Sequence, residues 1–162
     1  MNAHVDLRQD SLSGFDRDGS LIVAIGNDGR QDDGLGWALM DWLESNEICP
    51  KTELVRRYQL LLDDADLIKD KSRVLFVDAT KAADVSDIGL ETVHPRMDDS
   101  FTSHAVSIPT IMATCERCFN TVPQVHLLTI KGYKWELKFG LTENASKNLQ
   151  KAKNFLSQAI GD

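Results

Sequence analysis

Short apolar runs and segments of helical spacing follow one another along most of the chain. Residues 21–26, 73–79 and 125–130 are apolar and rich in β-branched residues, which is typical of strands buried on both faces of a sheet. Within residues 35–44, Leu35, Leu39 and Leu43 recur near helical spacing, so this pattern predicts a helix soon after the first strand. The run at 73–79 is expected at the centre of the sheet.

Weaker signals complete an alternating series of strands and helices. We expect further strands at 53–60 and 90–94, and helices at 63–70, at 108–120 and from about 143 to 160, the last behind a Thr142 cap. Strands that alternate with helices predict an α/β fold, in which helices cover both faces of a mainly parallel sheet.

Residues 1–20 lack hydrophobic periodicity and are rich in Asp, Ser, Gly and Arg. We interpret them as an N-terminal extension, either a tail or a docked arm. Residues 21–162 are expected to form a single domain, because a chain of 162 residues of which 42% are hydrophobic suits one core of ordinary size.

The charge and the apolar runs argue against several classes of partner. A formal net charge of -7 is unfavourable for binding a phosphate backbone, so nucleic acid is not expected as a partner. The apolar runs are far shorter than the roughly 20 residues of a membrane helix. The start of the chain is acidic and has no apolar signal core, so we expect a cytoplasmic protein that does not bind a membrane.

The three cysteines do not describe a disulfide framework, because their number is odd and the chain is of ordinary size. Cys115 and Cys118 form a C-x-x-C pair inside an expected helix, and Cys49 is the remaining cysteine. We favour packing for the pair over a redox or metal role.

Asp33, Asp78 and His104 lie in three polar stretches, each of which follows an expected strand. In an open α/β sheet, ligands collect beyond the carboxyl ends of the strands. Two carboxylates and one imidazole brought together at that edge outline a metal site. His94 and His126 compete with His104 for the imidazole role.

The loop at residues 26–36 is the sharpest local signal, because four glycines surround two adjacent acids. We assign it to binding the substrate or shaping the pocket, through Gly26, Asn27, Asp32, Gly34 and Gly36. Asn27 either orients the loop through local hydrogen bonds or belongs to a simple turn.

Each candidate ligand also has an ordinary structural explanation. Asp33 suits the first turn of a helix, where the macrodipole favours an acid. Asp78 suits a cap on the turn after its strand, and His104 suits an ordinary loop position. The three residues taken together favour a shared site.

Several motifs in order resemble the maturation endopeptidases of nickel-iron hydrogenases. They are Gly-Asn, a spacer and Asp-Asp-Gly-x-Gly at 26–36, Phe-Val-Asp-Ala at 76–79, and Ser-His at 103–104 before a helix. The resemblance extends from about residue 21 to the C-terminal helix. The spacer at 28–31 is more polar than the family pattern, and the extension at 1–20 has no counterpart in it.

The resemblance implies a three-layer αβα sandwich with a mainly parallel, twisted central sheet of about five strands. It also implies a metal-dependent endopeptidase that removes the C-terminal extension of a nickel-loaded hydrogenase large-subunit precursor. Asp33, Asp78 and His104 would contact the metal and be the catalytic residues. Nickel would be recognised in the precursor, and zinc or another divalent ion would be able to substitute for it. Such an ion can polarise the scissile carbonyl.

Two alternatives remain open. A phosphoacceptor receiver domain of two-component signalling would use Asp32, Asp33, Asp78 and Lys131. Against it, the acidic pair is displaced from its strand, and Gly132 follows Lys131 where receivers usually have proline. The second alternative is a metal-binding hydrogenase assembly factor that does not cleave.

Overall fold

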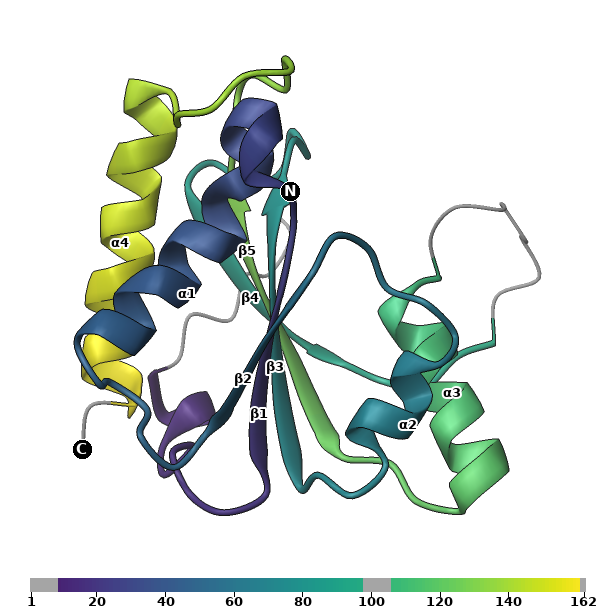
Figure 1. Cartoon of the computed structure of the whole chain (residues 1–162). Coiled ribbons are helices and arrows are strands. Elements are labelled where there is room, and N and C mark those ends of the chain that lie inside the picture. Colours follow the sequence, from purple (N-terminus) through teal and green to yellow (C-terminus); the bar gives the residue numbers. More distant parts are fainter. Residues whose placement is uncertain (1–8, 98–105, 161–162) are drawn as a thin grey trace.

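A five-stranded sheet with helices on both faces forms the centre of the protein (Figure 1). The computed structural model describes residues 9–97 and 106–160. The strands are β1 (Ser20–Ile25), β2 (Glu53–Arg57), β3 (Arg73–Thr80), β4 (Ile88–Val93) and β5 (Gln124–Lys131). The α-helices are α1 (Leu35–Ser45), α2 (Asp64–Ile68), α3 (Ile108–Phe119) and α4 (Glu143–Ile160), and the 3-10 helices are η1 (Gln9–Leu12) and η2 (Asp28–Gly34).

The strand order is β2-β1-β3-β5-β4, and all neighbours are parallel except the edge strand β4, which runs antiparallel to β5. The predicted three-layer αβα sandwich with a mainly parallel sheet is therefore confirmed. The central place of the 73–79 strand is also confirmed, because β3 lies between β1 and β5.

Two hydrophobic cores lie on opposite faces of the sheet, because successive strand residues point to alternate sides. Ile22, Leu75 and Val77 lie in the core shared with α1 and α4. Val23 and Phe76 lie in the other core, with side chains of α2 and α3. Figure 1 shows the same division, with α1 and α4 on one side of the sheet and α2 and α3 on the other.

The segment before β1 contributes to the first core. Leu12 and Phe15 are almost fully buried there, and η1 contacts α4. Residues 9–19 are therefore docked on the domain, and the core begins before residue 21. Hydrophobic periodicity could not reveal this docking, because only two isolated apolar residues anchor the segment.

Several predicted boundaries differ from the structure. β2 ends at Arg57 and not near residue 60, because the chain leaves the sheet towards Asp64, whose Oδ2 accepts a hydrogen bond from the Leu61 amide at 2.9 Å. The expected 63–70 helix is the shorter α2. Thr142 caps α4 as predicted, since its Oγ1 accepts from the Ala145 amide at 3.3 Å.

Within residues 9–97 and 106–160, none of the helices is both long and apolar enough to cross a membrane.

Candidate functional site

The carboxyl ends of β1 and β3 meet η2, which leads directly into α1. Asn27 closes this loop in two ways. Its side-chain Oδ1 accepts from the Gly29 amide at 2.9 Å, and its main-chain amide donates to the Asp33 carbonyl at 3.0 Å. Of the two roles considered for Asn27, the structure shows orientation of the loop through local hydrogen bonds.

Two glycines of the loop allow the backbone to approach the strand ends. A Cβ at Gly26, whose φ is +155°, would lie 2.1 Å from the Asp33 carbonyl oxygen. A Cβ at Gly36 would lie 2.9 Å from the Ile25 carbonyl oxygen and 3.2 Å from that of Val77. Gly34 is the N-cap residue of α1. The glycines therefore seat the loop and the first turn of α1 against β1 and β3.

The structure brings Asp33 and Asp78 together at this edge of the sheet. Asp33 is partly buried in the last turn of η2, and Asp78 is partly buried near the end of β3. Burial raises the pKa of Asp78, and the negative charge of Asp33 raises it further, to about 7. Burial also raises the pKa of Asp33, although the charge of Arg30 opposes this. The two carboxylates thus share one electrostatic environment.

His104 lies outside the described residues, so its place relative to the two acids stays a prediction. Val106 is the first described residue after it, and its amide donates to the Leu60 carbonyl at 3.4 Å, in the loop that follows β2. The described part of the chain contains no group of three His, Cys, Asp or Glu residues arranged to hold a metal ion. The predicted three-residue site therefore remains untested.

The other two histidines lie away from the acidic pair. His94 is exposed and follows β4, whose end at Val93 pairs with Val125 at the start of β5. His126 is buried and pairs with Leu75, whereas Asp78 pairs with Thr129 further along the strands. Because both lie towards the amino end of β5, neither stands beside Asp78.

Asp32 occupies a different environment from its neighbour Asp33. It is fully buried, and its carboxylate accepts hydrogen bonds from the amides of Tyr133 (2.7 Å), Lys134 (3.1 Å) and Thr142 (2.8 Å) and from the Thr142 hydroxyl (2.8 Å). Burial alone raises its pKa, but these hydrogen bonds outweigh burial and hold the pKa below its usual range. Asp32 therefore fixes the segment between β5 and α4 against the loop.

Gln31 makes further bonds to the same segment, residues 132–142, which we call the clasp segment. Its amide donates to the Lys138 carbonyl at 2.9 Å, and its Oε1 accepts from the Glu136 amide at 3.1 Å. Its backbone adopts φ 51° and ψ −116°, a conformation that costs a non-glycine residue about 1–3 kcal/mol. The polar spacer is thus held in one conformation by a partner about a hundred residues away.

Sequence reasoning did not find the clasp segment, because nothing in its composition indicates that its amides bond Asp32. Two exposed apolar side chains, Leu137 and Phe139, also lie on it. The cysteines do not join the site. Cys115 is buried and bonds the Thr121 carbonyl, as expected of a packing residue, whereas Cys118 is exposed.

The fold is similar to that of solved nickel-iron hydrogenase maturation proteases. The maturation protease HycI from Thermococcus kodakarensis matches with a TM-score of 0.71 at 17% identity, over 95% of this chain and 98% of that one. The hydrogenase 2 maturation peptidase from a Thaumarchaeota archaeon matches with a TM-score of 0.64 at 18% identity, over 88% and 97% of the two chains. The maturating endopeptidase HybD from Escherichia coli matches with a TM-score of 0.66 at 13% identity, over 88% and 90%.

No protein-family model matches the sequence, and no curated protein does. The resemblance seen in the sequence motifs is thus confirmed at the level of the fold, over nearly the full length of the compared chains.

Proposed function

We propose that the protein is an endopeptidase that removes the C-terminal extension of a nickel-loaded nickel-iron hydrogenase large-subunit precursor. One observation carries the proposal: two acids from separate motifs, Asp33 and Asp78, meet at the carboxyl edge of a sheet whose fold matches maturation proteases. The order of the motifs along the chain supports it as well.

The acidic pair is chemically suited to a divalent ion. Burial raises the pKa of Asp78, and repulsion from the Asp33 carboxylate raises it further, to about 7. A divalent cation would remove this repulsion, and carboxylate oxygens are ligands that such ions accept. Asp33, Asp78 and His104 would hold the nickel of the precursor, and zinc or another divalent ion would serve in its place.

The residues around the pair would then bind and orient the precursor. A divalent ion supplies Lewis acidity at such a site. The loop at 26–36 holds Asp33 in place. The Asn27 amide donates to the Asp33 carbonyl, and Gly26 lets its own backbone lie against that carbonyl. The pairing of β3 with β1 and β5 fixes Asp78 in the same way. The precursor would therefore meet a preformed pair of acids.

The proposal is tested by cleavage of the host's large-subunit precursor with and without nickel, followed by intact mass. The expected result is nickel-dependent loss of the C-terminal peptide by the wild-type protein, abolished in Asp33→Asn, Asp78→Asn and His104→Ala. Binding of the nickel-loaded precursor without cleavage would establish the alternative of an assembly factor. An absence of both binding and cleavage would refute both proposals.

The strand order of the sheet argues against the receiver-domain alternative. Receiver domains have the parallel strand order 2-1-3-4-5, whereas here β4 is an antiparallel edge strand beyond β5. The Lys131 ammonium donates to the carbonyls of Lys81 and Ala82, so it is engaged with the chain and not directed at Asp78.

A further inference from the structure

A row of four side chains crosses the sheet at the level of Asp78. The register pairs Arg57 of β2 with Ile25 of β1. Ala24 pairs with Val77, which puts Ile25 beside Asp78, and Asp78 pairs with Thr129 of β5. Arg57, Ile25, Asp78 and Thr129 therefore follow one another across neighbouring strands.

All four side chains lie on the face covered by α2 and α3. Side chains two residues apart on a strand share a face. Val55, Val23 and Phe76, each two residues before a member of the row, pack in the core of that face. Arg57 and Asp78 thus face the same space from either side of Ile25.

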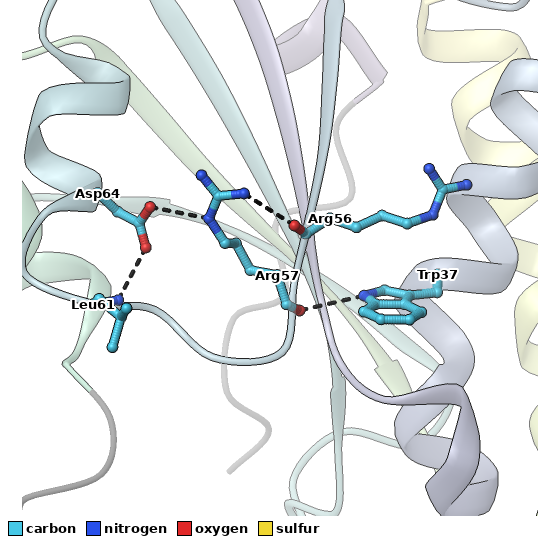
Figure 2. A network of polar contacts seen from close by, with 5 residues as sticks. All are labelled: Trp37, Arg56, Arg57, Leu61 and Asp64. Carbon is cyan, nitrogen blue, oxygen red and sulfur yellow. Dashed lines mark hydrogen bonds and ion pairs between the residues drawn. The ribbon is translucent and has the colours of Figure 1, made fainter.

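The Arg57 guanidinium is held in a fixed position. Its Nε donates to Asp64 Oδ1 at 3.1 Å, and its Nη1 donates to the Arg56 carbonyl at 3.1 Å. Asp64 is itself fixed, because it is buried and its other oxygen accepts from the Leu61 amide. Figure 2 shows this network, with the Arg57 guanidinium between Asp64 and the Arg56 carbonyl.

Arg57 keeps unused hydrogen-bonding capacity. A guanidinium has five N–H donors, and the bonds to Asp64 and Arg56 occupy two of them. The side chain is 37% exposed, so a partner can reach it from solvent. The planar arrangement of its donors suits a carboxylate better than any other common group of a polypeptide.

The row carries opposite charges at two separate positions. Arg57 and Asp78 stand two strand spacings apart, which is roughly 10 Å between their backbones. The edge therefore offers a cation at β2 and an acidic pair at η2 and β3. Arg57 attracts a carboxylate of a bound polypeptide, whereas Asp33 and Asp78 attract its divalent ion, so the two charges fix which way the polypeptide lies.

We propose that Arg57 is a specificity-determining residue that binds a carboxylate of the partner polypeptide beside the acidic pair. This inference rests on the proposed endopeptidase function. An extended chain spans at most about 3.3–3.6 Å per residue, so the carboxylate lies about three residues from the group held at the acidic pair. It is either an acidic side chain or the C-terminal carboxylate of the cleaved segment.

The test measures cleavage of the nickel-loaded precursor by the wild type, Arg57→Met, Arg57→Lys and the matched control Arg56→Met. Arg56 is the neighbouring arginine on the opposite face, where it pairs with Asp41 and Glu44 of α1. We expect Arg57→Met to raise KM about tenfold with kcat within about twofold, and Arg57→Lys to recover part of the loss. Arg56→Met should leave both constants unchanged.

Two kinds of precursor variant distinguish the sources of the carboxylate. In one kind, each acidic residue within five positions of the cleavage point is replaced by its amide, and in the other a Gly-Ser tail displaces the terminal carboxylate. The variant that removes the true partner should raise KM for the wild type and not for Arg57→Met, because the interaction is already absent there. The wild-type KM should also rise more steeply with salt than that of Arg57→Met.

An unchanged KM in Arg57→Met, with the wild type active, would overturn this inference and leave the proposed function intact. Equal increases in KM in Arg57→Met and Arg57→Lys, with a lower melting temperature in both, would give Arg57 a structural role with Asp64. This outcome would also overturn the inference. If the wild type cleaves no precursor, the proposed function fails, and the inference fails with it.

Discussion

Asp32 and Asp33 are adjacent in the chain, yet their carboxylates have opposite environments. Asp32 accepts four hydrogen bonds from the clasp segment and has a lowered pKa. Asp33 has no side-chain hydrogen bond within residues 9–97 and 106–160, lies near a second acid and has a raised pKa. One acid stabilises the loop through its hydrogen bonds, whereas the carboxylate of the other is the one that the proposed metal site would use. Under the proposed function, a structural role and a binding role therefore fall to adjacent residues.

The largest expected effect is on the structural side of this comparison. Asp32→Ala leaves three partly buried amides and one partly buried hydroxyl without their acceptor, so we expect a loss of about 4 kcal/mol in the free energy of unfolding. Urea denaturation measures this loss. Asp33→Ala is the matched control and should change stability by less than about 1 kcal/mol. Equal losses in the two variants would contradict the division of roles.

The second prediction concerns the acidic pair in the metal-free protein. The pKa of Asp78 is raised to about 7 in the folded state, above its unfolded value of about 3.9. Its ionisation therefore lowers stability as pH rises from about 4 to about 7, and the full penalty is present above that range. Asp78→Asn removes this penalty, so it should stabilise the protein at pH 8 by on the order of 3 kcal/mol.

Thermal unfolding of both proteins across pH checks this second prediction. The gain from Asp78→Asn should vanish below about pH 3, where the wild-type carboxyl is protonated in both the folded and unfolded states. A gain that does not change with pH would show that repulsion and burial of the charge are not its cause.

The third prediction tests the acidic pair as ligands. Nickel or zinc at about 100 times its measured Kd should raise the free energy of unfolding of the wild type by about 2.7 kcal/mol. Asp33→Asn and Asp78→Asn should lose this stabilisation, and Asp32→Asn should keep it, because Asp32 is fully buried and bonded to the clasp segment. Calorimetric titration supplies the Kd. Equal metal binding by Asp33→Asn and the wild type would exclude Asp33 as a ligand.

The smallest expected effect is at Gln31. Gln31→Gly relieves a backbone with φ 51° but loses the bond to the Glu136 amide, so the net change should stay within about 1 kcal/mol. Gln31→Ala loses the same bond and keeps the strain. It should therefore be less stable than Gln31→Gly by about 1 kcal/mol, as measured by thermal unfolding. The reverse order would show that the strain is not released by glycine.

The sequence predicted the parts of the fold that depend on local pattern. Apolar runs predicted strands β1, β3 and β5, and the helical spacing of apolar residues predicted α1. Asp33 and Asp78 could be brought to one edge because parallel strands share a direction, and β1 and β3 are parallel neighbours. Thr142 was recognised as a cap because capping depends on a few consecutive residues.

The features that the sequence did not reveal depend on contacts between distant segments. The docking of Leu12 and Phe15, the antiparallel direction of β4 and the bonds of Asp32 to the clasp segment all join elements far apart in the chain. Arg57 was also missed, because its place beside the acidic pair follows from the strand order and register and not from a motif. The position of His104 stays a prediction.

The bonds between Asp32 and the clasp segment span 101 to 110 positions, which has a consequence for synthesis of the protein. While a ribosome is still producing α3 and β5, Asp32 has none of its amide partners, and the loop that carries Asp33 is not yet held. Contacts of such long separation form late, because their loop-closure entropy is large. The conformation of the loop that carries Asp33 therefore becomes fixed only after Thr142 has emerged, so an unfinished chain lacks the geometry on which the proposed site depends.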